Sequence, residues 1–215
     1  MSEHDARFWD RAAKKYAASP IDDEAGFEMT LARTRALMPP DARVLELGCG
    51  TGTAALCLAD SVKSYVGTDI SAGMIAIAQD KLETAHQSGL NATLAFRRAT
   101  ADTLAREGVQ YDVVQGFNYL HLAGSLPVVL AQIHSMLVPG GLFIAKTPCV
   151  GDMNPLIRLA IPVMRLVGKA PSVVTICSSG SLVQAIGEAG FEILENERHG
   201  TKKSDYCPFI VARAT

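Results

Sequence analysis

Two hydrophobic periodicities alternate along most of this 215-residue chain. Short apolar runs, typical of strands that are buried in a sheet, indicate a first set of elements. They occupy residues 43–47, 65–68, 93–96, 112–115 and 142–146. Segments with apolar residues at helical spacing precede or separate these runs, at residues 3–18, 22–37, 53–59, 71–86 and 126–137. Because parallel strands need crossover connections, the alternation predicts an α/β fold with a parallel sheet and helices on both faces.

The last third of the chain follows a different order. A helix is predicted at 182–189 and ends before Gly190, and strands are predicted at 191–194 and 205–212. No helical pattern separates these two strands, so we expect them to pair antiparallel at the edge of the sheet. Ligands of such sheets bind beyond the carboxyl ends of the strands. One cleft is therefore expected to collect residues 48–52, Asp69, residues 100–102 and residues 115–118.

Residues 113–145 contain no charged side chain, and a stretch of that length is long enough to span a membrane. Its contents favour another interpretation, because glutamine, asparagine, histidine, proline and glycine interrupt it repeatedly. We therefore predict that this stretch forms a buried strand, a loop, a helix and a second strand.

Composition and charge narrow the classes of function. Apolar residues make up 48% and charged residues 20% of the chain, and the net charge of -2 argues against a nucleic acid as partner. The five cysteines include no pair at zinc-ligand spacing, so no metal site is predicted, and their odd, scattered set suggests a reducing compartment. The first ten residues are polar and lack an export signal, which makes the protein's expected location cytoplasmic.

The strongest motif is the glycine-rich run Glu46–Gly52 (ELGCGTG), which follows a predicted strand and precedes a predicted helix. Glycines at such a place let the backbone turn tightly and approach a ligand closely. A dinucleotide fingerprint is the competing interpretation, but its third glycine position holds Thr53. The acidic Glu46, two residues before the first glycine, suits a cationic ligand better than a pyrophosphate.

With this motif the sequence resembles the class I S-adenosylmethionine-dependent methyltransferases, and it is similar to the group that acts in ubiquinone and menaquinone biosynthesis. Four motifs within about residues 40–212 carry the resemblance, namely Val44–Gly52, Val66–Met74, Val138–Leu142 and Ala189–Phe191. The resemblance implies a Rossmann-like, seven-stranded and mostly parallel sheet with an antiparallel last strand and helices on both faces. It further implies S-adenosyl-L-methionine as the cofactor, a methyltransferase domain at 41–215 and an N-terminal helical cap at 1–40.

The resemblance also implies roles for single residues around the cofactor. Glu46 and the backbone of Gly48 and Gly50 are expected to hold the methionine end. Asp69 is expected to accept hydrogen bonds from both ribose hydroxyls, unless it only caps the helix that follows. The other expected cofactor contacts are the Ala101 N–H, the Gln115 carbonyl, and the side chains of Tyr16, Ile70, Met74 and Asp102.

Two of these assignments have alternatives. Thr100 stands where the family often has an aspartate that binds the adenine, so Asp102 is either its replacement or part of a helix cap. Met74 is either a wall of the adenine site or an ordinary residue of the core.

Methyl transfer from a sulfonium needs positioning and desolvation, and it needs a base only where the acceptor must lose a proton. His121, shortly after the fourth predicted strand, is the candidate catalytic base, with a hydrogen bond in the loop as its alternative role. Lys146 lies in the same region, where we expect a salt bridge or solvent exposure. Residues 116–119 (GFNY) lack the Asn/Asp-Pro-Pro-aromatic signature of nucleic-acid amino methylases, which again argues against such an acceptor.

An apolar insertion at about residues 152–175 follows the fifth predicted strand and is expected to lie over the cleft as a lid. Asn154 and Pro155 predict the start of a helix, which Pro162 should kink or break. A stretch that is apolar on most sides is buried, faces an apolar ligand or touches a membrane. Three interpretations therefore stay open: a packed helix, a lid for a lipophilic or aromatic acceptor, and peripheral membrane contact through residues 153–168.

The sequence thus predicts an enzyme that transfers a methyl group from S-adenosyl-L-methionine to a small-molecule methyl acceptor of apolar or aromatic character. The alternative from another class is a regulatory protein that binds the cofactor without catalysis. A nicotinamide-dependent oxidoreductase is a weaker alternative, because the glycine spacing disfavours it. The methylated atom and the oligomeric state stay open.

Overall fold

A computed structural model of the chain describes residues 3–166, 170–202 and 205–215. Within these ranges a seven-stranded sheet has the order β3-β2-β1-β4-β5-β7-β6. Its strands are β1 (Arg43–Leu47), β2 (Ser64–Asp69), β3 (Leu94–Arg98), β4 (Tyr111–Phe117), β5 (Leu137–Lys146), β6 (Phe191–Arg198) and β7 (Pro208–Ala214). Strands β1 to β5 pair in parallel, whereas β7 is antiparallel to both β5 and β6. The predicted mixed sheet with an antiparallel last strand is confirmed.

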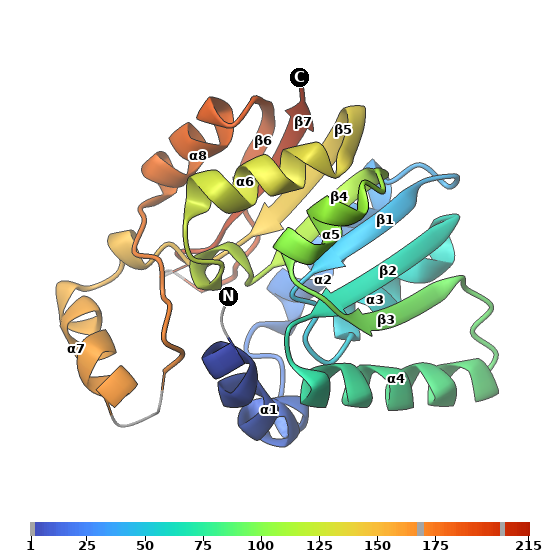
Figure 1. Cartoon of the computed structure of the whole chain (residues 1–215), viewed down its shortest axis with the longest axis horizontal. Coiled ribbons are helices and arrows are strands. Elements are labelled where there is room, and N and C mark those ends of the chain that lie inside the picture. The colour runs from blue at the N-terminus through green and yellow to red at the C-terminus, as the bar shows by residue number, and fades with distance from the viewer. Residues whose placement is uncertain (1–2, 167–169, 203–204) are drawn as a thin grey trace.

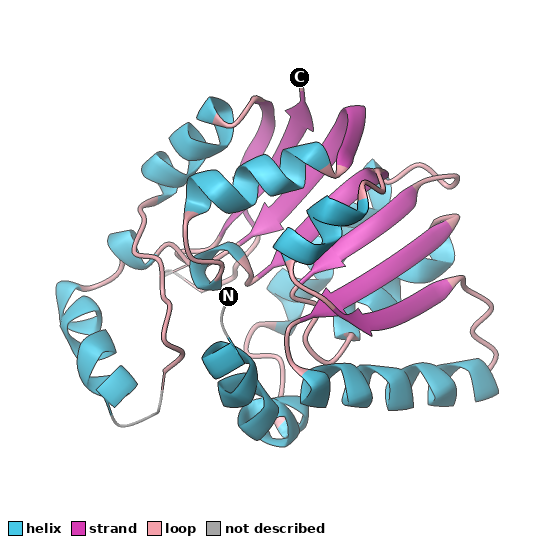
Figure 2. Cartoon of the chain, viewed as in Figure 1, coloured by secondary structure: helices cyan, strands magenta, loops and turns pink. Residues whose placement is uncertain are grey.

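Helices cover both faces of this sheet (Figure 2). The described helices are α1 (Glu3–Ala18), α2 (Glu24–Leu37), α3 (Thr53–Leu58), α4 (Ala72–Gln87), α5 (Ala101–Glu107), α6 (Leu126–Ser135), α7 (Pro155–Leu166) and α8 (Ser179–Glu188), with short turns η1 (Ala59–Ser61), η2 (Leu120–Leu122) and η3 (Val150–Asp152). Side chains of β1 alternate between two hydrophobic clusters, as the period of a strand requires. Leu45 packs with residues of α5, α6 and α8, whereas Val44 packs with residues of α2, α3 and α4.

The uncharged stretch 113–145 forms most of β4, then η2, α6 and most of β5. Its strands occupy the middle of the sheet, and Val113, Val114, Phe143 and Ile144 are fully buried. The predicted strand, loop, helix and strand are therefore confirmed. No helix in the described ranges is both long and apolar enough to cross a membrane.

The starts of β5 and β7 were predicted wrongly, and β6 continues to Arg198 rather than ending at Leu194. Strand β5 begins at Leu137, because a shift of register between Tyr111 and Val113 lets the glycine turn after Pro139 stay within the strand. Strand β7 begins at Pro208 rather than at Asp205. The Asp205 carboxylate instead accepts hydrogen bonds from Gly200 N and Cys207 N, at 2.8 and 2.9 Å, which fixes a turn before the strand.

Helix α1 lies beside the sheet rather than on either face and packs along α4 (Figure 1). Asp10 Oδ1 accepts hydrogen bonds from Ser71 Oγ at 2.6 Å and from Gly73 N at 2.9 Å, so a side chain of α1 supplies acceptors at the start of α4. Asp5, near the other end of α1, accepts a hydrogen bond from Ser172 N at 3.0 Å. Helix α1 therefore connects α4 with the segment that follows α7. The expected boundary at residue 40 stays a prediction.

Helix α7 projects from the body of the molecule on the side where the parallel strands end (Figure 1). It continues through Pro162, so the proline does not break the helix. Ile161 is buried, whereas Leu156 and Met164 are 70% and 42% exposed. Residues 167–169 of the expected lid lie outside the described residues.

Candidate active site

The glycine-rich loop connects β1 to α3 and has a backbone that glycine alone adopts easily. Gly48 has a φ of 70° and Gly50 a φ of 53°. A side chain on Gly48 would start 2.7 Å from the ring of Tyr119, so the loop also has no room for one. Lys81 of α4 holds the far side of the loop by donating to Thr51 Oγ1 at 3.1 Å. The loop is thus tight and fixed, and Gly48 and Gly50 are its half-buried positions.

Glu46 is a buried carboxylate at the end of β1, with 2% of its surface exposed. Its Oε2 accepts a hydrogen bond from Tyr65 OH at 2.8 Å, and the Gln115 amide donates to the same hydroxyl. Burial raises the pKa of Glu46 to about 7. The other atom of this amide, Gln115 Oε1, is buried and has no hydrogen-bond partner among the described residues. A carboxylate and a carbonyl oxygen therefore offer unused acceptor capacity beside the loop.

Asp69 ends β2 and lies against the same loop. Its Oδ2 accepts a hydrogen bond from Gly50 N at 3.1 Å, and its Oδ1 accepts one from Ser71 N at 2.8 Å. The N-cap of α4 is Ser71, whose hydroxyl accepts from Met74 N at 3.1 Å, so Asp69 is not the cap itself. Each carboxylate oxygen keeps a further lone pair for a ligand.

Three other residues that are predicted to contact the cofactor lie near Asp69 and the glycine loop. Tyr16 of α1 is half exposed, and its ring lies 3.6 Å from the point where a side chain on Gly50 would start. Burial, with the charge of Asp69 nearby, raises the pKa of its phenol. Ile70 and Met74 are both buried, with 6% and 2% of their surfaces exposed. Their roles at an adenine stay predictions.

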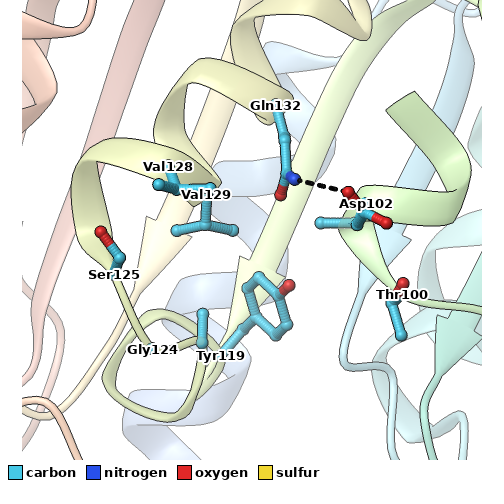
Figure 3. A pocket seen from close by; sticks show the side chains of 10 residues that line it. Thr100, Asp102, Tyr119, Gly124, Ser125, Val128, Val129 and Gln132 are labelled. Carbon is cyan, nitrogen blue, oxygen red and sulfur yellow. Dashed lines mark hydrogen bonds between the residues drawn. The ribbon is translucent and has the colours of Figure 1, made fainter. Parts of the chain in front are cut away.

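Ala101 and Asp102 line a cavity of about 430 Å³ between the first turns of α5 and α6 (Figure 3). Thr100 is the N-cap of α5, because its hydroxyl accepts from Thr103 N at 3.2 Å. Asp102 is exposed and pairs with Arg106 at 3.0 Å, and it accepts a bond from Gln132 at 3.4 Å. Asp102 is therefore not the helix cap, and its carboxylate already has cationic and amide donors.

A second cavity, of about 560 Å³, opens on the other side of the glycine loop. Residues of the loop form one end, including Glu46 and Gly48. Other lining residues come from α1, α2, the ends of β4 and β5, and the turn before β7; they include Tyr16, Phe27, Phe117, Asn118, Lys146, Met153 and Tyr206. The single cleft that the sequence predicts is therefore not found: residues 100–102 line the smaller cavity, and part of the glycine loop with residues 117–118 lines the larger one. Asp69 and Gln115 are absent from the residues that line either cavity.

Tyr119 lies where the two cavities approach each other. Its ring lines the smaller cavity and packs against the backbone of Gly48, which lines the larger one (Figure 3). Burial raises the pKa of its phenol, and the charge of Asp69 adds to this rise. The preceding Asn118 has a φ of 54°, a left-handed conformation that turns the chain sharply at the end of β4. Sequence reasoning missed Tyr119, since an aromatic residue in a loop carries no signal of such a contact.

His121 lies in the short turn η2 that follows β4, and its side chain contacts the residue directly after β5. Its Nδ1 lies 3.0 Å from the buried Thr147 Oγ1, and its carbonyl accepts a hydrogen bond from Thr175 N at 2.7 Å. Burial lowers the pKa of its imidazole to about 4, so the ring is neutral and weakly basic at pH 7. His121 is absent from the residues that line either cavity. Its assignment as a base stays a prediction.

Among the described residues no group of three or more His, Cys, Asp or Glu side chains is arranged to hold a metal ion. The site therefore consists of a half-buried glycine loop, one buried and one half-buried carboxylate, one buried amide oxygen without a partner among the described residues, and two cavities. This set of donors and acceptors suits an elongated ligand with a cationic group near Glu46 and hydroxyl groups near Asp69.

Comparisons with known proteins show which proteins the chain is similar to. The profile of a family described as a methyltransferase domain matches residues 6–196. Over 106 residues, 49% of this chain, the sequence is 37% identical to the ubiquinone biosynthesis O-methyltransferase of Roseobacter denitrificans, and the match covers 40% of that protein. The chain spans less than two thirds of the length of the curated relatives that it matches first.

Two solved structures illustrate the likeness of fold. The magnesium protoporphyrin IX methyltransferase of Synechocystis PCC 6803, solved with bound S-adenosylhomocysteine, has a TM-score of 0.71 at 19% identity, with 98% of this chain and 95% of that chain covered. The [4+2]-cyclase SpnF has a TM-score of 0.63 at 22% identity, with 87% and 80% covered. At these identities the likeness concerns the fold alone.

Proposed function

We propose that this chain, which belongs to the class I S-adenosylmethionine-dependent methyltransferases, transfers a methyl group from that cofactor to a small apolar or aromatic molecule. The family match over residues 6–196 confirms the resemblance drawn from the glycine-rich motif. The observation that carries the proposal is the pair of carboxylates beside the fixed glycine loop, the buried Glu46 and the half-buried Asp69.

The residues around the loop fit S-adenosyl-L-methionine. Glu46 and the unpaired Gln115 Oε1 supply negative charge and an acceptor for an ammonium group. Asp69 keeps lone pairs for two hydroxyl groups, and the cavity beside Ala101 has room for a base. When bound, the cofactor supplies an electrophilic methyl group on a sulfonium. The chain's own contribution is to orient the cofactor and to exclude water.

The larger cavity supports an apolar or aromatic acceptor. Phe27, Phe117 and Met153 bring apolar side chains to a space that begins at the glycine loop. The low basicity of His121 favours an acceptor that needs little help in losing a proton. Desolvation and alignment are then the main contributions of the site.

A protein that binds the cofactor without methylating anything is the second candidate. SpnF supports keeping it, because a [4+2]-cyclase with the same fold indicates that the fold alone does not determine the reaction. Detection of methyl transfer to any metabolite would remove this candidate. A screen of small metabolites with cofactor labelled on its methyl group makes that measurement.

Cofactor choice is testable by thermal shift. S-adenosylhomocysteine at a hundredfold excess over its dissociation constant should stabilise the protein by about 2.7 kcal/mol, which raises the melting temperature by several degrees. NADH at the same concentration should leave the melting temperature unchanged. Stabilisation by NADH, and none by S-adenosylhomocysteine, would sink the assignment.

The segment 152–175 is proposed as a lid that contacts the acceptor. Its Met153 lines the larger cavity, while Leu156 and Met164 expose apolar surface on α7. Replacing both exposed residues by Ser should raise the KM of an acceptor found in the labelled-cofactor screen by about a hundredfold or more, since each apolar side chain that the acceptor buries contributes about 1.5–3 kcal/mol and about 1.4 kcal/mol is a factor of ten. S-adenosylhomocysteine affinity should stay unchanged.

A matched control for the lid is Val109→Ser, which removes an apolar side chain ahead of β4 that is about as exposed as Met164. Its acceptor KM should equal that of the unmodified protein. Membrane contact through 153–168 is the competing role, and it predicts that the double variant loses binding to lipid vesicles while its KM is unaffected.

A further inference from the structure

A lysine at the end of β5 faces the larger cavity with neutral partners alone. Lys146 Nζ donates to Thr30 Oγ1 at 3.0 Å and lies 3.5 Å from Gly26 O. No carboxylate oxygen of the described residues lies within 4.0 Å of this ammonium, so it differs from the salt bridge expected from the sequence. A half-buried ammonium without a counter-ion is costly unless a ligand supplies one.

The partners of Lys146 hold its side chain in one place. Thr30 Oγ1 donates to Gly26 O at 2.8 Å and lies 3.1 Å from His199 Nδ1. His199 is buried and stacks on Phe209 with 4.3 Å between ring centroids. The lysine is therefore fixed by a hydroxyl that is itself fixed by the core, which reduces the entropy lost when a ligand binds.

The carboxylates of the same cavity are already engaged with other groups. Asp23 accepts hydrogen bonds from Gly26 N and Thr201 N, and Asp205 accepts them from Gly200 N and Cys207 N. Asp22 pairs with Lys202 at 3.7 Å, and Glu46 accepts from Tyr65. The negative charges of the cavity thus have donors of their own. Lys146 has no contacting carboxylate among the described residues, and the charge of Asp23 reaches it only beyond ion-pair distance.

The sheet order places this ammonium on the acceptor side of the site. The glycine loop follows β1 and Asp69 ends β2, whereas β5 lies beyond β4 on the opposite side of β1. Neighbouring strands are about 4.8 Å apart, so Lys146 lies roughly two strand spacings from the loop. Phe117 of β4 is its partner in register and brings an apolar ring to the same cavity.

We propose that Lys146 binds an anionic group, a carboxylate or a phenolate, of an otherwise apolar methyl acceptor. The proposal rests on the proposed methyltransferase function and adds the charge of its substrate. A carboxylate enters the site already deprotonated, so no side chain has to accept a proton. A phenol has to release its proton to solvent, and an ammonium beside its oxygen favours that release because it stabilises the phenolate. This agrees with the low basicity of His121.

The test uses two fluorescent probes with S-adenosylhomocysteine present at saturation. One is 8-anilino-1-naphthalenesulfonate, which is apolar and anionic, and the other is N-phenyl-1-naphthylamine, which has the same rings and no charge. Lys146→Met should raise the dissociation constant of the anionic probe about tenfold, as loss of a charge-assisted hydrogen bond does. Binding of the neutral probe should stay within twofold, and Lys146→Arg should recover most of the anion affinity.

Two further variants complete the test, one as a control and one as a substitute for Lys146→Met. Lys202→Met removes the same charge from the rim of the cavity, where the ammonium already pairs with Asp22, and should leave both probes unchanged. If Lys146→Met does not fold, Lys146→Gln keeps a donor to Thr30 and removes the charge. Unchanged affinity for the anionic probe, or equal loss of both probes, would overturn the proposal.

The cofactor itself carries a carboxylate, and the same variants distinguish this source. If Lys146 held the cofactor, Lys146→Met would lower the affinity for S-adenosylhomocysteine and leave the affinity for the anionic probe unchanged. That result would overturn the acceptor proposal. Failure of the unmodified protein to bind S-adenosylhomocysteine would instead contradict the proposed function. The probe measurements repeated without S-adenosylhomocysteine then still decide whether Lys146 binds an anion.

Discussion

Replacing Glu46 by Gln should stabilise the cofactor-free protein at pH 8 by about 3 kcal/mol and leave its stability at pH 4 nearly unchanged. The folded protein holds the Glu46 proton up to a pKa of about 7, whereas the ordinary value is 4.5. Between these two values the folded state binds more protons than the unfolded state, so stability is lost as the pH rises through this window. Glutamine cannot ionise and removes that loss.

Denaturant titrations at pH 4, 6 and 8 measure this effect. Glu192→Gln is the matched control, because Glu192 is exposed on β6 and its replacement should leave the pH dependence unchanged. Equal slopes of unfolding free energy against pH in the unmodified protein and in Glu46→Gln would contradict the buried-carboxylate account.

The same carboxylate should make cofactor binding depend on pH. An ammonium group prefers the ionised form of Glu46, and about a tenth of the carboxyl groups are ionised one pH unit below the pKa. The dissociation constant of S-adenosylhomocysteine should therefore rise roughly tenfold from pH 8 to pH 6. In Glu46→Gln the affinity should be lower at pH 8 and nearly independent of pH, as calorimetric titrations would show.

Replacing Asp69 by Ala should weaken the binding of S-adenosylhomocysteine by about 1–3 kcal/mol, which raises its dissociation constant roughly 5- to 150-fold. The change removes the acceptor for two ribose hydroxyls and also the acceptor for Gly50 N and Ser71 N. Asp69→Asn retains one carbonyl oxygen and should lose less.

Asp102→Ala provides the comparison for Asp69. Its carboxylate is exposed and pairs with Arg106, so we expect a change in cofactor affinity of less than threefold. An Asp69→Ala variant with unchanged affinity would mean that this residue only shapes the loop. A large loss in Asp102→Ala would instead support its role at the adenine.

The elements whose identity depends on local pattern were predictable from the sequence. The apolar run 43–47 agrees with β1, and the serine before Ala72 caps α4 as its position indicates. The glycine loop was predictable because its positive φ angles leave few other residues that fit. The short helix α5 was missed, although Thr100 and Thr103 form a capping box that marks its start.

The features that were missed depend on residues far apart in the chain. The hydrogen bonds of Asp10 to Ser71 and Gly73 join segments separated by some sixty positions, and no local pattern announces them. The raised pKa of Glu46 follows from its burial beside Tyr65 and Gln115, which only the assembled sheet creates. Whether a cleft is one space or two depends likewise on how one ring, that of Tyr119, packs against Gly48.

The position of β7 in the sheet has a consequence for the chain while it is being synthesised. Strand β7 lies between β5 and β6 although it is the last of the seven to leave the ribosome. Until it arrives, the apolar edge of β5 has no partner, and such unpaired edges are prone to pair with other chains. The half of the sheet that carries the glycine loop and Asp69 is complete much earlier. The hydrophobic cluster under the loop nevertheless includes Phe209 and Val211 of β7, so a nascent chain completes this core only when it also covers the edge of β5.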